Sequence, residues 1–510
     1  MKTESRNKST TINQQSTTNH HSKIPQSTIV DIIDLDASGD GVARIQGRRL
    51  AIPFTIPGER VRVRVEPRRS DRVAATAIEI IRSSPHRVRP VCPYFAPATG
   101  DSCGGCAWQH IAYEEQLRIK TARLTRLVRD AVRSAPAPLP MIAATPLDDP
   151  WKYRNKVHFV FGSLDSRDRE LARGRLVIGH YARGSRRIVP VDQCPVHDDR
   201  GNAIAFALHR ACVTASAGRT LQSVAVRVAP STSETLATVV VTNTGDKTLR
   251  TATQAVIDGD AAPTALHVNV HPKGDAYIFG SETRRIAGPA RIREDLAGIS
   301  FLISPTAFFQ TNVRAAEALV GLVLAAVPAG TSIVLDLYAG AGLFALPLAR
   351  RGHRVIAVEE NRAAVADGIA SREVNRIAEG RCRFVASPVE RVVRRRMTAD
   401  AVVLDPPREG CSRGVLDAVF GVLAPQTGVY VSCDPETLAR DLAIITARGY
   451  AIRSIQPVDM FPHTPHIEAV VVLDRGPSSF ADRATKDHGR TKDSRTDKEP
   501  STKNQGLIRK

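Results

Sequence analysis

The chain has 510 residues, a formal net charge of +19 at pH 7 and an isoelectric point of about 10.0. This length allows several domains, each with its own core, and the excess of Lys and Arg favours an anionic partner such as RNA, DNA or a membrane surface. The N-terminal residues contain no apolar run of signal-peptide or membrane-spanning length, so we expect a cytoplasmic protein without a membrane role. Eight cysteines are too few for a disulfide scaffold in a chain of this size.

The first 84 residues predict a disordered arm followed by a small β-domain. Residues 1–26 are rich in Ser, Thr, Asn and Gln, whereas residues 27–84 alternate apolar and polar positions between turns that contain Gly or Pro. This alternation is typical of a small β-barrel of the oligonucleotide-binding kind. The segments 39–44, 53–59 and 61–65 (GDGVAR, PFTIPGE and VRVRV) resemble the TRAM domain, an RNA-binding module of RNA-modifying enzymes.

The rest of the chain predicts an α/β fold in two further domains. Residues 85–325 combine a cysteine-rich loop, a basic helix near 113–132 and strand-like stretches such as 156–160, which indicates a middle α/β domain. From 326 to 475, apolar runs alternate with helical patterns, which predicts a parallel, doubly wound, Rossmann-like sheet. These runs are 333–335, 355–358, 401–404, 429–431 and 469–473. Residues 476–510 are polar and charged and predict a disordered basic tail.

A glycine-containing loop after the first of these runs indicates a nucleotide-like cofactor. Gly340 and Gly342 follow the strand directly, where backbone must approach a ligand closely. The next strand ends at Glu359, whose carboxylate can accept hydrogen bonds from ribose hydroxyls. The glycine spacing also fits dinucleotide-binding proteins. However, Asp336, four residues before the first glycine, resembles the S-adenosylmethionine loop of class I methyltransferases, which makes these four residues candidate cofactor contacts.

Two further strand ends carry residues that suggest a reaction on a nucleobase. Asp405-Pro406-Pro407-Arg408 has Arg at the position where amino-group methyltransferases carry an aromatic residue, which disfavours N-methylation of a base. Cys433 follows the next predicted strand, and the ends of both strands should line one crevice with the cofactor loop. A thiolate that adds to C6 of uracil enriches C5 in electrons, so that C5 can take a methyl group. An inert buried cysteine is the alternative interpretation.

A general base is also required, because the C5 proton must leave after methylation. Glu468 opens the last predicted strand, where burial would raise the pKa of its carboxyl group toward the range of a general base. His463 and His466 compete for a role in proton transfer.

The motifs from 304 to 468 together resemble the RNA 5-methyluridine methyltransferase family. They are SPxxFFQxN at 304–312, DLYxGxG at 336–342, DPPR at 405–408, SCDP at 432–435 and HxE at 466–468. The resemblance implies a cofactor pocket formed by Gln310, Tyr338, Glu359 and Asp405. It also implies that Cys433 is the nucleophile and Glu468 the proton acceptor, acting on a uridine that is turned out of its stack.

Four cysteines suggest a metal centre: Cys92, Cys103, Cys106 and Cys194. Four thiolates suit either a four-iron four-sulfur (4Fe-4S) cluster or tetrahedral zinc, and the spacing does not decide between them. The segment 103–110 (CGGCAWQH) resembles family members that carry an iron-sulfur cluster, which favours the cluster. The ten residues between Cys92 and Cys103 exceed the usual gap in the family. We expect the centre to have a structural or RNA-positioning role.

The barrel and the cysteine motif together resemble the branch of the family that modifies 23S ribosomal RNA. A transfer-RNA uracil-C5 methyltransferase is the alternative, as is methylation of another base atom. A third interpretation is a cluster-bearing RNA-binding protein without catalysis. We expect a monomer with RNA as its partner.

Overall fold

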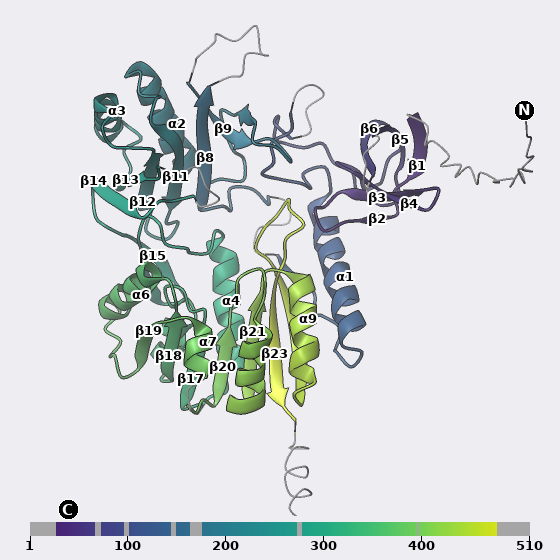
Figure 1. Cartoon of the computed structure of the whole chain (residues 1–510), viewed down its shortest axis with the longest axis vertical. Helices are drawn as coiled ribbons and strands as arrows, with labels where there is room; N and C mark the ends of the chain where they lie inside the picture. The colour runs from purple at the N-terminus through teal and green to yellow at the C-terminus, as the bar shows by residue number, and fades with distance from the viewer. Residues whose placement is uncertain are drawn as a thin grey trace, which may run out of the picture. The chain divides into compact units, whose positions relative to one another are not determined.

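A computed structural model describes residues 27–66, 73–95, 101–143, 149–163, 176–272, 278–394 and 397–476 (Figure 1). The disordered arm and tail predicted at the two ends lie outside these residues, apart from Gly476. The chain divides into two compact units. The first extends to Gln116 and includes 182–185 and 463–465; the second contains 117–181, 186–462 and the chain from His466 onward. Within the described ranges, the helices are too short or too polar to cross a membrane.

The first unit contains the predicted β-domain as a six-stranded sheet in the order β1-β5-β6-β4-β3-β2. Every second residue of β5, including Val61 and Val63, is fully buried, because side chains alternate between the two faces of a strand. The strands are β1 (Ser27–Asp31), β2 (Asp34–Leu35), β3 (Gly41–Ile45), β4 (Arg48–Ile52), β5 (Arg60–Glu66) and β6 (Val73–Arg82).

The second unit begins with most of helix α1 (Tyr113–Ala131), which confirms the predicted basic helix. It continues into a seven-stranded sheet in the order β10-β9-β8-β11-β12-β13-β14. The strands are β8 (Lys156–Ser163), β9 (Leu176–Tyr181), β10 (Ile188–Pro190), β11 (Leu221–Val228), β12 (Thr235–Val241), β13 (Ala265–Val270) and β14 (Glu282–Ala287). Helices α2 (Asp199–Thr214) and α3 (Lys247–Ile257) pack beside this sheet (Figure 1). A hairpin of β15 (Ile292–Leu296) and β16 (Ile299–Ile303) follows.

The C-terminal sheet has eight strands in the order β19-β18-β17-β20-β21-β23-β22-β7. All five apolar runs predicted from the sequence form strands in it. The strands are β7 (Ile142–Ala143), β17 (Ile333–Leu337), β18 (Arg354–Glu359), β19 (Cys382–Ala386), β20 (Ala401–Leu404), β21 (Thr427–Ser432), β22 (Tyr450–Asp459) and β23 (Glu468–Arg475). Strands β7, β19 and β22 were not among the predicted runs, because β7 has only two residues and polar residues interrupt the apolar pattern of the other two.

The prediction of a parallel sheet is wrong for one strand, β23. Strands β17 to β21 are parallel, but β23 lies between β21 and β22 and is antiparallel to both. The segment 460–467 joins β22 to β23 without a crossover helix, so the chain turns back on itself. Strand β23 therefore begins at the edge of the sheet where the parallel strands β17 to β21 end.

The two faces of this sheet are buried against different helices. Val334, Val403 and Val429 face one core with α4 (Val313–Ala326) and α5 (Ala345–Arg350). Leu335, Leu404 and Tyr430 face a second core on the opposite side. Helix α6 (Arg362–Val374) packs against β16 and β19. The second core includes α1, α7 (Val389–Val393), α8 (Arg413–Leu416), η1 (Asp417–Leu423) and α9 (Pro435–Thr446).

A buried ion pair joins α1 to the end of β22. Lys120 Nζ lies 2.6 Å from Asp459 Oδ1, and both side chains are fully buried. The same ammonium group donates to the carbonyl oxygen of Phe461 at 3.0 Å. Because a buried charge is costly without a partner, this pair defines where α1 can pack on the sheet.

Candidate active site

A cavity of about 1120 Å³ opens at the carboxyl ends of the parallel strands in the second unit. This is the edge at which open α/β sheets bind ligands. The cavity brings together residues that are more than 150 positions apart in the sequence. Its lining includes these residues predicted from the sequence: Gln310, Tyr338, Gly340, Glu359, Asp405, Arg408, Cys433 and Glu468.

The antiparallel strand explains how Cys433 and Glu468 meet. Ser432 at the end of β21 pairs with Ala469 in β23. In antiparallel register the next position along β21, Cys433, faces the previous position along β23, Glu468. Directly opposed residues have Cβ atoms about 5 Å apart, so the thiol and the carboxyl group lie side by side at the cavity wall.

The glycine loop is hydrogen-bonded to the carboxylate at the end of β18. Glu359 Oε2 accepts a hydrogen bond from the Gly340 N–H at 2.9 Å, and Oε1 accepts one from the Asn361 N–H at 2.8 Å. Gly340 has φ of 55°, and a Cβ atom built there would meet nothing within 4 Å. The backbone is therefore exposed to the cavity at this point, as a loop that approaches a cofactor requires.

Asp336 and Gly342, which the sequence predicted as cofactor contacts, are not in the cavity lining, and neither is Asn312. The Asp336 side chain is fully buried; burial raises its pKa well above the ordinary value, and nearby Asp405 raises it further. Gly342 has φ of 88°, and a Cβ atom there would lie 2.7 Å from the Phe384 ring. Asn312 caps α4, where its side chain accepts a hydrogen bond from the Ala315 N–H at 3.2 Å.

The cavity wall places the carboxyl groups of Asp405 and Glu468 near the Cys433 thiol and Arg408. Burial raises the pKa of the Asp405 carboxyl group to about 7, and it raises the pKa of Glu468 well above its ordinary value. The pKa of the Cys433 thiol is raised to about 12 by burial, with Glu468 and Asp405 adding to the effect. Arg408 acts in the opposite direction and lowers the pKa of both Cys433 and Glu468. Arg408 is thus the group in the wall that favours the thiolate.

Neither histidine considered for proton transfer lines the cavity. Burial lowers the pKa of His466 to about 4, so its imidazole is neutral at physiological pH. Its ring lies 6.0 Å from that of Phe461. His463 belongs to the first unit, where its backbone carbonyl accepts hydrogen bonds from the N–H groups of Ala107 and Trp108. Both observations favour Glu468 as the proton acceptor.

The sequence analysis missed a set of side chains on α9 that hold the Arg408 loop. The Thr437 hydroxyl donates to the Arg408 carbonyl at 3.0 Å, and Arg440 Nη2 donates to the Glu409 carbonyl at 2.8 Å. Asp441 Oδ2 accepts hydrogen bonds from the Cys411 N–H at 2.8 Å and the Tyr430 hydroxyl at 2.6 Å. These three residues of α9 form what we call the α9 clamp.

The α9 clamp connects Cys433 to the loop that carries Arg408. Helix α9 starts two residues after Cys433, and Asp434 caps it by accepting a hydrogen bond from the Thr437 N–H at 3.0 Å. The same helix then holds the backbone from Arg408 to Cys411. A spacing of i, i+3 and i+4 on one helix face was visible in the sequence, but it does not reveal which loop the face holds.

The four cysteines predicted as metal ligands fall in different parts of the chain. Cys92, Cys103 and Cys106 belong to the first unit and Cys194 to the second. In the first unit, the Gly105 N–H donates to Cys103 Sγ at 3.5 Å, and the Cys103 N–H donates to the Tyr94 carbonyl at 2.9 Å. Among the described residues, no group of three or more His, Cys, Asp or Glu side chains is arranged to hold a metal ion.

Two family models match the chain. The model described as tRNA (Uracil-5-)-methyltransferase matches residues 295–476, which include the whole cavity wall. The model described as tRNA (uracil(54)-C(5))-methyltransferase, TRAM domain, matches residues 29–86, which include the six-stranded sheet of the first unit apart from the start of β1.

Similar proteins extend over nearly the whole chain. An uncharacterized RNA methyltransferase of Gloeobacter violaceus is 36% identical over 460 residues, which is 88% of this chain and 97% of the relative. One of Halalkalibacterium halodurans is 32% identical and covers 87% and 96%. The crystal structure of Pyrococcus abyssi tRNA (uracil-54, C5)-methyltransferase in complex with S-adenosyl-L-homocysteine has a TM-score of 0.67 and 26% identity. That similarity covers 87% of this chain and 99% of the Pyrococcus chain.

The α9 clamp predicts how the Cys433 thiol reacts. In the wild-type protein, alkylation of Cys433 by iodoacetamide should continue to accelerate above pH 9, because the raised pKa delays formation of the thiolate.

Asp441→Ala removes the acceptor of two buried donors, which costs about 1–3 kcal/mol of stability and loosens the Arg408 loop. Alkylation of Cys433 at pH 8 should then slow, as measured by peptide mass spectrometry. Thr446→Val, on the same helix outside the clamp, is the control, and equal rates in both variants would contradict the prediction.

Proposed function

Because this chain belongs to the RNA uracil-C5 methyltransferase family, we propose that it methylates C5 of a uridine with Cys433 as nucleophile and Glu468 as general base. The observation that carries the proposal is the juxtaposition of these two side chains in one cavity with the predicted cofactor residues. S-adenosylmethionine supplies an electrophilic methyl group when it is bound. Gln310, Tyr338, Glu359 and Asp405 are the residues proposed to hold it.

Cys433 performs the first chemical step of the proposed reaction. Its sulfur forms a bond to C6 of the uracil, and the electron pair of the C5–C6 double bond moves toward C5 and the O4 carbonyl. The thiol must first lose its proton to solvent, and the positive charge of Arg408 favours that loss. The electron-rich C5 then forms its bond to the methyl group, while the bond between that methyl group and its sulfonium sulfur breaks and leaves its electron pair on the sulfur.

Glu468 completes the reaction. Its carboxylate takes the proton from C5, the electron pair of that C–H bond restores the C5–C6 double bond, and the sulfur of Cys433 leaves C6. A carboxylate with a raised pKa is a stronger base than one in water, which suits the removal of a proton from carbon. The cavity of about 1120 Å³ is large enough for a nucleotide base beside a cofactor.

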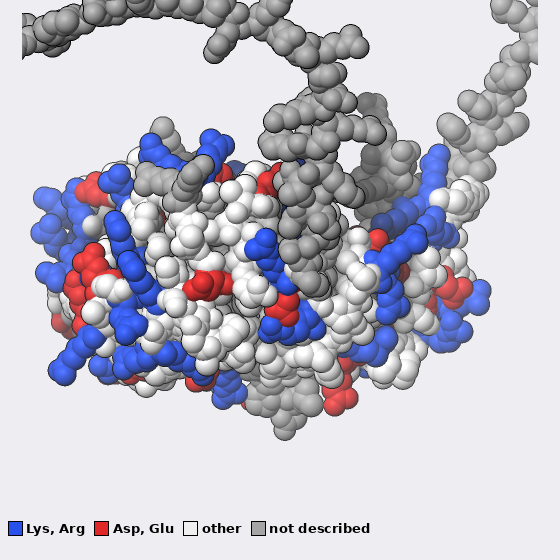
Figure 2. Space-filling view, turned by 90° about the horizontal axis from the view of Figure 1, so that it is seen from below, with Lys and Arg blue, Asp and Glu red and all other residues white. Residues whose placement is uncertain are grey.

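The charge of the protein supports RNA as the substrate. Lys and Arg number 71 against 52 Asp and Glu, and the face in Figure 2 carries more basic than acidic side chains. Cationic surfaces bind RNA by releasing the counterions of its phosphates. The match of residues 29–86 to a TRAM domain agrees with this assignment.

Ribosomal RNA is the substrate that we propose, since the β-barrel combined with the cysteine motif resembles the 23S branch of the family. Transfer RNA is the second candidate, and it is favoured by the similarity to the Pyrococcus abyssi tRNA enzyme over 87% of the chain. We further propose that Cys92, Cys103, Cys106 and Cys194 bind a 4Fe-4S cluster, with zinc as the alternative. The cysteine pattern supports this proposal, as does the N–H···S hydrogen bond to Cys103. No step of the reaction requires the metal.

The roles of Cys433 and Glu468 are tested with 5-fluorouridine RNA. Fluorine at C5 cannot leave as a cation, so the covalent adduct should accumulate and run as a shifted band on a denaturing gel. Cys433→Ala should form no adduct, and its methyl transfer should fall about 1000-fold or more while RNA binding persists. Glu468→Gln should form a stable adduct with ordinary RNA. Cys212→Ala, in the core of α2, is the matched control, and an adduct formed by Cys433→Ala would disprove the assignment.

The identity of the RNA is tested by mapping 5-methyluridine in a strain that lacks the gene. If ribosomal RNA is the substrate, one 5-methyluridine should disappear from 23S RNA, while transfer RNA keeps its modification. Loss from transfer RNA alone would replace the first candidate with the second.

The metal proposal is tested by analysis of anaerobically purified protein. A 4Fe-4S cluster predicts about four iron and four sulfide per chain and a broad visible absorbance that dithionite or air bleaches. Cys103→Ser should lose both metal and absorbance, whereas Cys382→Ser, in β19, should keep them. Stoichiometric zinc would favour the alternative, and absence of any metal would reject the site.

A further inference from the structure

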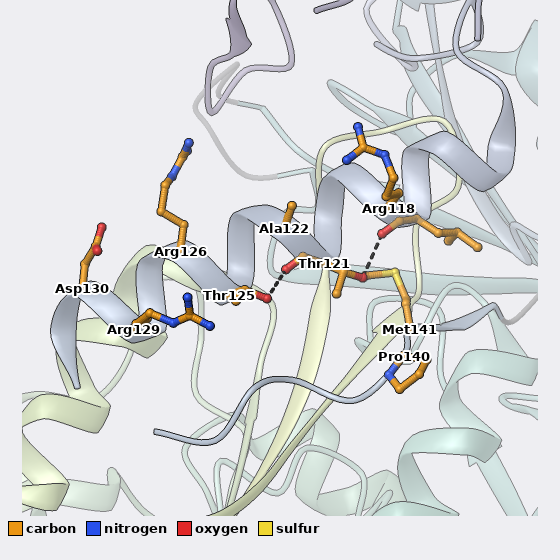
Figure 3. A pocket seen from close by; sticks show the side chains of 10 residues that line it. Arg118, Thr121, Ala122, Thr125, Arg126, Arg129, Asp130, Pro140 and Met141 are labelled. Atoms are coloured by element: carbon orange, nitrogen blue, oxygen red, sulfur yellow. Dashed lines mark hydrogen bonds between the residues drawn. The ribbon is translucent and has the colours of Figure 1, made fainter. Parts of the chain in front are cut away.

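A second hollow in the same unit runs along α1, away from the catalytic cavity. It has a volume of about 740 Å³ and is lined by one side of α1 together with Pro140 and Met141 (Figure 3). We call it the α1 groove. It lies outside the motifs used above, so the proposed chemistry leaves it unexplained.

Three arginines follow one stripe of the helix beside this groove. With 100° of rotation per residue, Arg118, Arg126 and Arg129 lie within about 80° of one another and span about 16 Å along the axis. All three are exposed and line the groove. Among the residues that the structure describes, Asp130 is the one carboxylate in the lining. The buried residues Lys120, Leu124 and Val128 occupy the opposite side of the helix. The exposed stripe therefore presents an elongated positive surface.

The floor of the groove suits a ribose backbone. Leu117, Pro140 and Met141 supply apolar surface. The hydroxyls of Thr121 and Thr125 donate to the carbonyls of Leu117 and Thr121 at 2.9 and 2.8 Å (Figure 3). A hydroxyl oxygen that donates can still accept, so both can receive a hydrogen bond from a ribose 2′-hydroxyl.

The helix also connects this groove to the catalytic cavity. Lys120 binds the carbonyl oxygen of Phe461, a residue whose side chain lines the cavity. Arg123 lies 2.5 Å from Glu436 at the start of α9. A strand bound on the outer side of α1 would thus be held in fixed relation to Cys433.

We propose that the α1 groove binds the ribose–phosphate backbone of the substrate RNA at nucleotides outside the target uridine. Arg118, Arg126 and Arg129 contact phosphates, and Thr121 and Thr125 accept hydrogen bonds from 2′-hydroxyls. The proposal deepens the proposed function and rests on RNA as the substrate. Its effect is on RNA affinity and leaves the chemical step unchanged.

The proposal is tested with the double variant Arg126→Glu/Arg129→Glu in the full-length protein. Binding of a fluorescent oligouridine is measured over a range of salt concentrations. The slope of log K against log salt should decrease by about 2, one for each lost phosphate contact. For the RNA that the wild-type protein methylates, KM should rise at least about tenfold while kcat is unchanged.

Arg354→Glu/Arg383→Glu is the matched control, because it makes the same change in charge at exposed positions of β18 and β19. If the control lowers the salt slope as much as the groove variant, the effect is one of net charge and the proposal is wrong. Arg126→Gln/Arg129→Gln, measured in parallel, guards against misfolding by charge reversal. Failure of the wild-type protein to methylate any RNA would reject the proposed function, whereas the salt slope tests the groove independently.

The ribose contacts are tested by Thr121→Val/Thr125→Val, which keeps the shape of both side chains. RNA affinity should fall about threefold, and affinity for DNA of the same sequence should stay constant. An unchanged ratio of RNA to DNA affinity would remove the 2′-hydroxyl contacts from the proposal. Unchanged salt slopes in the arginine variants would instead indicate that a different kind of partner occupies the groove.

Discussion

The active site depends on the antiparallel placement of β23 beside β21. In parallel neighbours, the residues after each strand converge on one edge, which gathers Tyr338, Asp405 and Cys433. A strand running the other way contributes its first residue to that edge. Glu468 therefore reaches the nucleophile from the start of β23, through the register Ser432 to Ala469. Had β23 run parallel, Glu468 would lie at the opposite edge of the sheet, a strand length from Cys433.

The electrostatics of the cavity follow from this convergence. Burial raises the pKa of Asp405, Glu468 and Cys433, and neighbouring carboxyl groups raise the pKa of Glu468 and Cys433 further. Such a wall suits proton removal from carbon but opposes the thiolate that starts the reaction. Arg408 offsets part of that opposition, and the α9 clamp keeps its backbone in place. Cys433, the Arg408 loop and helix α9 are thereby connected by direct contacts and adjacent chain.

Helix α1 links the proposed RNA-binding groove to the sheet that carries the cavity. Its buried side carries Lys120, whose ion pair with Asp459 lies next to the segment that leads to Glu468. Its exposed side carries the arginine stripe of the α1 groove. Helix α1 therefore has one face that packs on the sheet of the candidate site and another face whose positive charge suits phosphate groups.

Local sequence was sufficient to predict most strands of the C-terminal sheet and many of the residues that line the cavity. Apolar runs identified β17, β18, β20, β21 and β23, since a strand buried on both faces is apolar at every position. Motifs at strand ends identified Glu359, Asp405, Cys433 and Glu468, because a ligand site of this fold lies where strands end. The sequence did not reveal β22, whose polar residues interrupt the apolar pattern, nor the reversed direction of β23.

Tertiary structure alone decided which residues meet across long sequence separations. The side chains of Thr437, Arg440 and Asp441 share a helix face, but their partners lie about 30 residues away in the Arg408 loop. Likewise, Lys120 and Asp459 are 339 positions apart. Residue types and periodicity specify what a segment can bind, whereas the order and direction of strands determine what it does bind. That is why the sequence by itself could predict a nucleophile and a base, whereas only the fold showed why these two residues are neighbours.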